Sequence, residues 1–246
     1  MRCISLGEFV EWVFFGKAYE LRASVVGFNL PFDLSRLALR HGPARGKKMR
    51  GGFSFTLSQN GRRPRVQVKH LSSRSALIQF AIASKHTAAS QNFWRGSFID
   101  VKTIAAALTS QSFSLARLAS FLKLPSRKAQ TDDHGKELTP EYINYAVQDV
   151  QVTWEAFEVL RTKFSALELT STALNSILSE ASLGKAYLKD MGIVPCREAQ
   201  PDFPPALIGT ILSTYFGGRT EVRIRRKPVR VLYCDFLSMY PTVCTL

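Results

Sequence analysis

The chain has 246 residues, which leaves room for one large domain or for one domain and part of a second. Hydrophobic residues make up 46% of the sequence, so a packed core can form and a wholly disordered chain is excluded. The four cysteines show no C-x-x-C spacing, which indicates a reducing compartment and argues against secretion or a zinc site. The apolar run over 9–15 is far shorter than the roughly 20 residues of a membrane helix, so we expect a cytoplasmic protein without membrane contact and leave an organelle open.

The positive charge is concentrated in one part of the chain. Thirty-three Lys and Arg against 19 Asp and Glu give a formal net charge of +14. Residues 34–99 contain no acidic residue but thirteen basic ones, namely Arg36, Arg40, Arg45, Lys47, Lys48, Arg50, Arg62, Arg63, Arg65, Lys69, Arg74, Lys85 and Arg95. Such a segment creates a positive potential that attracts a polyanion, so nucleic acid is the expected partner. From charge alone, a basic surface that serves only solubility is an equal alternative.

The first half of the sequence predicts a mixture of helices and strands. The expected elements are a helix over 9–21, a buried strand over 23–28, a helix over 33–40, a basic loop over 42–52 and hairpin strands over 53–57 and 65–69. The first strand is expected to stop before Pro31, with the second helix following it. Alternation of apolar and polar residues on both sides of Asn60-Gly61 indicates the hairpin.

The second half of the sequence contains clear helix starts. Ser114 and the Thr139-Pro-Glu sequence have the features of an N-cap, and a strand over 96–101 leads into a helix from Thr103. The helix that follows Thr139 is expected to end near residue 164. The later expected elements are a helical stretch over 171–191, a proline-rich stretch over 195–205, a helix ending near 215, and strands over 219–225 and 229–235.

The composition of the chain changes near residues 165–170, and we place a domain boundary there. The alternation of strands with helices favours the α/β class. The sequence therefore predicts a first domain over 1–168, which carries a basic insert over 41–75, and a second part over 169–246.

Two short patterns in the first domain carry carboxylates. Asn29-Leu-Pro-Phe-Asp33 follows a predicted strand, where ligand sites of α/β sheets usually lie, although Asp33 is also a plausible helix cap. Tyr145 and Asp149 share one helical face because they are four residues apart, although a solvent-exposed hydrogen-bonded pair has the same spacing. Two carboxylates with a phenol suit metal-assisted phosphodiester hydrolysis, in which carboxylates hold Mg²⁺ and the phenol orients the attacking water.

A third carboxylate follows the predicted strand over 229–233 near the end of the chain. Asp235 ends this strand, and Ser238 and Tyr240 follow in a turn that contains proline. An apolar strand that ends in an Asp places the carboxylate at the mouth of a cleft.

Paired glycines precede that strand. In Tyr215-Phe-Gly-Gly218-Arg219, Gly217 and Gly218 allow the backbone to approach a ligand closely, and Arg219 is suited to bind phosphate. An ordinary helix C-cap explains the two glycines equally well when they are taken alone.

Taken together, these four patterns resemble the motifs of family B DNA polymerases, from a viral, plasmid or organellar replicon. In chain order, residues 29–33, 145–149, 215–218 and 235–241 are similar to the second exonuclease motif, the third exonuclease motif, the linker motif of the protein-primed branch and polymerase motif A. The patterns span nearly the whole chain and occur in the order of the family. The resemblance implies a ribonuclease-H-like 3′–5′ exonuclease domain followed by the start of a polymerase palm.

For the exonuclease domain, the resemblance assigns a role to each matching residue. Asp33 and Asp149 match carboxylates that bind metal, and Tyr145 matches the residue that orients the attacking water. Asn29 and Phe32 match residues that contact the frayed 3′ end of the DNA.

A lysine ahead of the third motif often reaches the scissile phosphate in this branch. Lys128 or Lys123 matches that lysine, although a basic loop beside Arg127 is the simpler explanation. Asp100 also resembles a recurrent family position, and we interpret it as a structural helix cap.

For the palm, the resemblance implies a second metal centre. Asp235 matches one of two carboxylates that bind paired Mg²⁺ or Mn²⁺ ions, Tyr240 matches the residue under the sugar of the incoming dNTP, and Ser238 matches a contact to DNA or nucleotide. The residues expected to hold the template between the two sites are Tyr215, Gly217, Gly218 and Arg219. The implied partners are DNA, dNTP and a terminal priming protein.

The sequence also departs from the family pattern. No Asp-x-Glu motif precedes Asn29, and the chain stops at Leu246, shortly after motif A. A hard cation with few carboxylates binds weakly. We therefore expect a fragment of a DNA polymerase with proofreading ancestry and with little or no turnover by itself. The alternatives are a stand-alone 3′–5′ exonuclease and a non-catalytic nucleic-acid-binding remnant that uses the basic stretch over 36–95.

Overall fold

The computed structural model describes residues 4–81, 96–129, 131, 137–214, 222–225, 227–234, 239, 242 and 245. The chain packs as two compact units that divide between Val194 and Pro195. This division comes later than the change of composition near 165–170, because Leu169, Ile177 and Ala186 still pack in the core of the first unit. Packing and composition therefore mark different boundaries.

The described chain opens with two consecutive helices. The short α1 (Leu6–Glu8) is closed at its start by a capping box, in which Ser5 and Glu8 each bond the other's backbone N–H. It continues into η1 (Phe9–Glu20), a π-helix that buries Val10, Phe14, Phe15 and Ala18. The predicted helix over 9–21 is confirmed, with π-type hydrogen bonding in place of α-type.

Two parallel strands form the centre of the first unit. β1 (Ser24–Gly27) pairs with β6 (Ser97–Asp100), so that Gly27 lies opposite Asp100. Both predicted strands are confirmed, although β1 is only half-buried. Because parallel strands end at the same edge, the segments after Gly27 and Asp100 start side by side.

The helix that follows β1 begins earlier than the sequence pattern suggests. α2 (Leu30–Leu37) starts three residues before the predicted 33–40, with Asn29 at its N-cap in the left-handed region (φ 65°, ψ 45°). Pro31 lies in the first turn, where its missing N–H costs no helical hydrogen bond. The prediction was wrong at this end because it treated the proline as the end of the preceding segment.

An antiparallel sheet of four strands makes up the rest of the basic region. Its strands, in spatial order, are β2 (Arg40–Pro43), β3 (Phe53–Thr56), β4 (Val66–His70) and β5 (Ala76–Phe80). β3 and β4 form the predicted hairpin, with Phe53 opposite Val68. Arg40, expected at the end of a helix, instead belongs to β2, where it pairs with Thr56.

The caps predicted in the second half of the first unit are confirmed. They begin α3 (Val101–Thr109), α4 (Leu115–Leu122) and α5 (Pro140–Ser165), although the sequence pattern placed the start of α3 two residues later, at Thr103. In each case the side chain of the N-cap, Asp100, Ser114 or Thr139, accepts the N–H of the third helical residue. The 3₁₀ turn η3 (Leu174–Ser176) and α6 (Glu180–Asp190) complete this unit.

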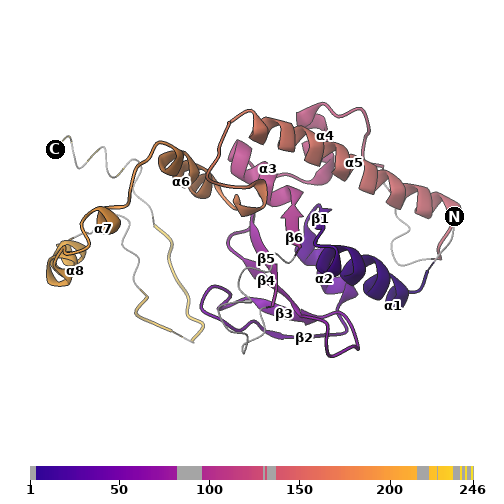
Figure 1. The fold of residues 1–246 in the computed structure, drawn as a ribbon, viewed down its shortest axis with the longest axis horizontal. Coiled ribbons are helices and arrows are strands. Elements are labelled where there is room, and N and C mark those ends of the chain that lie inside the picture. The colour runs from indigo at the N-terminus through magenta and orange to yellow at the C-terminus, as the bar shows by residue number, and fades with distance from the viewer. Residues whose placement is uncertain are drawn as a thin grey trace. The chain divides into compact units, whose positions relative to one another are not determined.

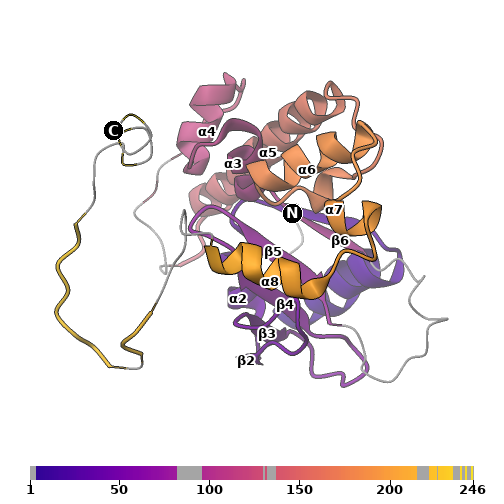
Figure 2. The same ribbon diagram turned by 90° about the vertical axis from the view of Figure 1, so that its left-hand side faces the viewer.

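Two hydrophobic clusters meet at the parallel strands. Val25 and Phe98 pack with η1, α2 and the antiparallel sheet, whereas their neighbours Val26 and Ile99 pack with α3 and α5. Successive strand residues point to opposite faces, so each central strand contributes to both clusters. In Figure 1, α3, α4 and α5 lie on one side of β1 and β6, with η1, α2 and the antiparallel sheet on the other, and Figure 2 shows the same grouping from a second direction.

The second unit contains the helices α7 (Cys196–Ala199) and α8 (Pro205–Thr214). The predicted strand over 229–235 is wrong for its described residues, 229–234, which have irregular backbone and an exposed Leu232 (90%). The described part of the predicted strand over 219–225, residues 222–225, is irregular as well. A strand needs a hydrogen-bonded neighbour as well as an apolar pattern, and the described residues of this unit include no partner strand.

The chain is therefore a mixed α/β protein, as predicted, with one parallel and one antiparallel sheet. In the described part of the chain, no helix combines the length and the apolar character needed to cross a membrane.

Candidate functional site

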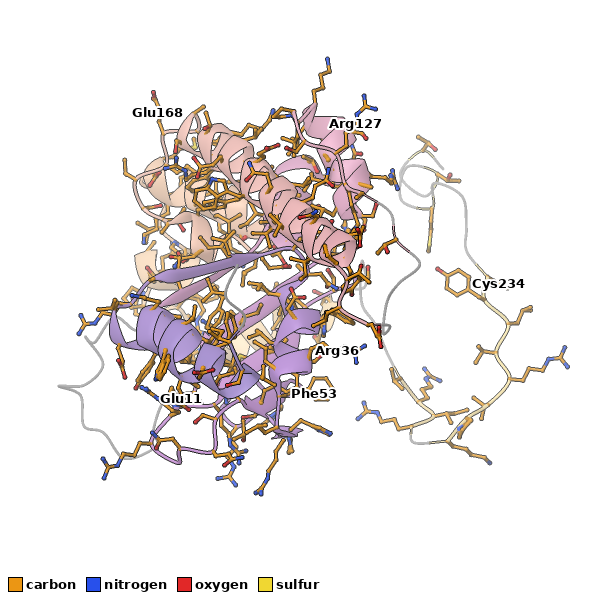
Figure 3. The ribbon with its side chains drawn as sticks, turned by 90° about the vertical axis from the view of Figure 1, so that its right-hand side faces the viewer. Glu11, Arg36, Phe53, Arg127, Glu168 and Cys234 are labelled. Carbon is orange, nitrogen blue, oxygen red and sulfur yellow. The ribbon has the colours of Figure 1, made fainter. Side chains whose placement is uncertain are left out.

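A cleft of about 770 Å³ opens on the first unit and brings together distant parts of the sequence. Its lining comes from Phe9 and Phe14 of η1, from residues between 25 and 37, from Ser114 and Leu115, from Lys128, and from α5 residues between 149 and 154. Figure 3 shows α5 running above η1 and α2, with Arg36 projecting from α2 and Arg127 next to Lys128 in the chain. Five of the residues predicted from the sequence, Asn29, Phe32, Asp33, Lys128 and Asp149, line this one cleft.

One wall is formed by the first turn of α2. Asn29 caps the helix with its backbone in the left-handed region, which Asn tolerates better than most residues. Asp33 then lies inside the first turn, where its carboxylate faces the cleft. Asn29 occupies the N-cap of α2, so the alternative interpretation of Asp33 as a helix cap is wrong.

A buried carboxylate stands behind this wall. Asp100 is only 6% exposed and accepts three hydrogen bonds, from the Leu30 N–H (3.0 Å), the Thr103 N–H (3.1 Å) and the Thr103 hydroxyl (2.6 Å). It caps α3 as predicted, and in addition it fixes the first N–H of α2. The Thr103 hydroxyl oxygen in turn accepts the Ala76 N–H of β5 (3.1 Å), so one small network joins both sheets to α2 and α3.

Asp33 lies in an unfavourable electrostatic environment. Loss of surrounding water, and next to it the negative charge of Asp100, raise the pKa of Asp33 to about 6. Both causes act against the ionised carboxylate, so a cation beside Asp33 would lower this pKa again.

The opposite wall carries a carboxylate that already has a cation. The Lys128 ammonium donates to both oxygens of Asp149 (2.9 and 2.7 Å) and to the Tyr145 hydroxyl (2.7 Å), and lies 4.7 Å from the centre of the Tyr145 ring. Burial favours the neutral amine, but the bonds to Asp149 and Tyr145 outweigh it and raise the pKa of Lys128. Tyr145 and Asp149 thus share a helical face as predicted, and Lys128 joins them.

The structure distinguishes between the two candidate lysines. Lys128 lines the cleft, whereas Lys123 ends α4 in a left-handed conformation and is not part of the lining. Of the two lysines, Lys128 is the one that lies beside Asp149.

The cleft supplies hard oxygen donors but not a complete metal site. In the described ranges, no group of three or more His, Cys, Asp or Glu side chains is arranged to hold a metal ion. Both oxygens of Asp149 are bound by Lys128, and Asp235, the third predicted metal ligand, lies outside the described residues. Two carboxylates suit Mg²⁺ chemically, yet they are too few to bind it firmly by themselves.

Much of the remaining lining is apolar, and part of it faces solvent. The Phe32 ring is 52% exposed, with the Arg36 guanidinium 4.8 Å from its centre. On the α5 wall, Val150 and Trp154 are exposed and follow Asp149 by one and five residues. Sequence reasoning missed both, because positions one and five residues after Asp149 are rotated by about 100° and 140° from it on the helix and lie outside the face that Tyr145 and Asp149 share.

The basic region lies on the antiparallel sheet and its loops. Arg63 is paired with Glu11 and Glu20, and Arg74 lies 3.5 Å from Glu180. Eight other basic side chains between residues 34 and 81 are exposed, namely Arg36, Arg40, Arg45, Lys47, Lys48, Arg50, Arg62 and Arg65. Lys85 and Arg95 lie outside the described residues.

The predicted polymerase residues lie outside the described part of the chain. They are Tyr215, Gly217, Gly218, Arg219, Asp235, Ser238 and Tyr240. Comparison with protein-family models, with curated proteins and with solved structures finds no match to this chain. The function therefore has to be inferred from the chemistry of the cleft.

Proposed function

We propose that the first unit is a 3′–5′ exonuclease module of a family B DNA polymerase, and that its cleft binds the 3′ end of a single DNA strand. One observation supports this most strongly. Asn29, Phe32 and Asp33, which belong to the pattern like the second exonuclease motif, line one cleft with Asp149 of the pattern like the third motif, more than 100 positions away. Lys128 lines the same cleft and bonds Asp149 and Tyr145. A set of structural caps and surface pairs has no reason to converge in this way.

Each group in the cleft has a chemical part in this proposal. The reaction is hydrolysis, in which water adds to the terminal phosphorus, the 3′ oxygen of the preceding nucleotide leaves, and a proton returns to that oxygen. Lys128 would contact the phosphate, Tyr145 would orient the water, and Asn29 and Phe32 would hold the terminal nucleotide. The complete enzyme would use Mg²⁺ or Mn²⁺, for which Asp33 and Asp149 supply two carboxylates.

The hydrogen bonds of Lys128 leave room for a substrate contact. An ammonium has three N–H groups. The two oxygens of the Asp149 carboxylate lie close together and share one N–H, and the Tyr145 hydroxyl accepts a second. The third N–H can therefore donate a charge-assisted bond to a phosphate that enters the cleft.

The second unit completes the proposal as the start of a polymerase palm, on the resemblance of residues 215–219 and 235–241 alone. Asp235 would bind paired Mg²⁺ ions, and Tyr240 and Ser238 would contact the dNTP or DNA. The template would lie along Tyr215, Gly217, Gly218 and Arg219. A terminal priming protein is a further proposed partner. An Asp-x-Glu strand encoded upstream would complete the exonuclease centre, and an Asp-bearing hairpin encoded downstream would complete the polymerase centre.

A second candidate function is supported by a different observation. Eight exposed cations on and around the antiparallel sheet, without an acidic residue from 34 to 81, suit a phosphate backbone whether or not the cleft is active. In that case the chain is a non-catalytic nucleic-acid-binding protein. A stand-alone exonuclease would require the cleft to act without the second unit.

Binding of a short single-stranded DNA, measured by fluorescence anisotropy at constant low salt, tests the proposal. Lys128→Met is expected to weaken binding about tenfold, because the substitution removes one charge-assisted phosphate contact. Lys123→Met is the matched control, since it removes the same charge from the same region but outside the cleft. Equal effects of the two substitutions would favour the basic-surface alternative.

A digestion assay asks whether the cleft hydrolyses DNA by itself, although the turnover of this chain alone is expected to be low. With a 5′-labelled strand, shortening from the 3′ end that requires Mg²⁺ and is lost in Asp149→Asn supports the exonuclease. Salt-sensitive binding to the basic region, without cleft-dependent binding or digestion, supports the second candidate.

A further inference from the structure

Trp154 is a feature of the cleft that the proposed function leaves unexplained. Its side chain is 51% exposed although it lines the cleft, and Val150, one turn earlier on α5, is 70% exposed. Trp is a costly residue to leave in water, because it carries the largest apolar surface of the common side chains. Exposed aromatic surface inside a concave site is typical of a place where a ligand packs.

The indole is supported from behind. The Trp154 and Phe157 rings lie 5.4 Å apart at an interplanar angle of 45°, and Phe157 is buried in the main core. An aromatic ring held in this way can bind a flat partner with little further loss of rotamer freedom.

The position of Trp154 relates it to the proposed phosphate contact. Five residues along an α-helix correspond to about 7.5 Å along its axis and to a rotation of about 140° past one full turn, so Trp154 and Asp149 lie on different faces of α5. Both residues nevertheless line the same cleft as Lys128, so a strand whose phosphate contacts Lys128 can extend toward the indole within that cleft. Phe32, which borders the same cleft from α2 with Arg36 beside it, provides a second aromatic surface.

We propose that Trp154 is a base-stacking residue, which makes the cleft specific for nucleic acid whose bases are unpaired. This inference rests on the proposed binding of a DNA strand in the cleft. Stacking on an aromatic ring tolerates any base, because every base has a π-face. The bases of a duplex are already stacked on one another, so their faces do not reach the indole.

Two probes of equal length and charge test this role, namely oligothymidylate and a strand of the same length without bases. The wild-type chain is expected to bind oligothymidylate about tenfold more tightly than the abasic strand, as the loss of one base stack implies. Trp154→Ala should abolish most of this difference and leave the affinity for the abasic strand unchanged. Trp154→Phe should keep part of the preference, because a smaller ring still stacks.

Trp12 provides the matched control. It is 65% exposed on η1 and is not part of the cleft lining, so Trp12→Ala should change neither affinity. Circular dichroism of all variants establishes that they fold. The inference is overturned if Trp154→Ala weakens both probes equally or weakens neither.

The same measurements separate this inference from the proposed function. Lys128→Met should weaken both probes, since it removes a phosphate contact. If Lys128→Met does so and Trp154→Ala has no selective effect, only the stacking role fails. If the wild-type chain binds neither probe, or Lys128→Met has no effect, the proposed function fails, and the stacking role fails with it.

Discussion

The two walls of the cleft hold carboxylates in opposite electrostatic situations. On the α2 wall, Asp33 has partly lost its water and lies near the charge of Asp100, which raises its pKa to about 6. On the α5 wall, Asp149 lies against the Lys128 ammonium at 2.7 Å. The sequence predicted the same metal-binding role for both residues. In the structure Asp149 has a cation beside it, whereas Asp33 has a second carboxylate nearby.

This difference indicates beside which carboxylate an added cation would be stabilised more strongly. A cation bound beside Asp33 would offset the negative charges of Asp33 and Asp100, whereas a cation bound beside Asp149 has to compete with Lys128. The chemistry of each carboxylate therefore depends on its surroundings, which are burial and the charge of Asp100 for Asp33, and the Lys128 ammonium for Asp149.

The largest expected effect is on the free energy of unfolding, when the carboxylate that anchors the start of α2 is removed. Asp100→Ala leaves the buried N–H groups of Leu30 and Thr103 without an acceptor, so we expect the free energy of unfolding to fall by about 3 kcal/mol. Urea unfolding measures this. Asp190→Ala is the matched control, because Asp190 also accepts two backbone N–H groups but on the surface, and it should cost clearly less.

A stability change close to that of the control would mean that Asp100 does not anchor the two helices. In that case another interaction would hold the start of α2, and with it Asp33, in position.

The next effect concerns the charge of Asp33. An unfolded Asp titrates near pH 4, so between about pH 4 and 6 the folded state retains a proton that the unfolded state has lost. Stability contributed by this group should therefore fall as the pH rises through this window. Asp33→Asn should remove that part of the pH dependence. Unfolding curves of both chains from pH 4 to 7 measure it, and parallel curves would contradict the raised pKa.

The smallest effect is expected on the α5 wall. Tyr145→Phe removes one of three acceptors of Lys128, but water can replace it at this partly exposed site, so we expect a loss of about 0.5 kcal/mol in the free energy of unfolding. Tyr187→Phe, on α6 away from the cleft, serves as the control. A loss as large as that of Asp100→Ala would show that the α5 wall is not the more tolerant one.

Local features of the fold could be predicted from the sequence. The caps at Ser114, Thr139 and Asp100 depend on residues within one helical turn, and the β3–β4 hairpin depends on alternation over a short stretch. Such features need no knowledge of the rest of the chain, and they were correct.

Features that depend on distant residues could not be predicted. The approach of Asp100 to Leu30 follows from the pairing of β1 with β6, which joins segments about 70 residues apart, and no local pattern encodes it. The strand expected at 229–235 was wrong in its described part for the same reason, since a strand exists only with a neighbour. Trp154 was missed because one exposed aromatic residue on a helix is ordinary until the cleft around it is known.

The double anchoring by Asp100 also limits how this protein can vary. Asparagine offers only one acceptor oxygen where two are used, and the extra methylene of glutamate moves the carboxylate away from the positions that the Leu30 and Thr103 N–H groups require. Neither of the two nearest chemical relatives of aspartate fits there. Among natural variants of this chain, position 100 should accordingly stay invariant even in lineages where the residues facing the open cleft have drifted.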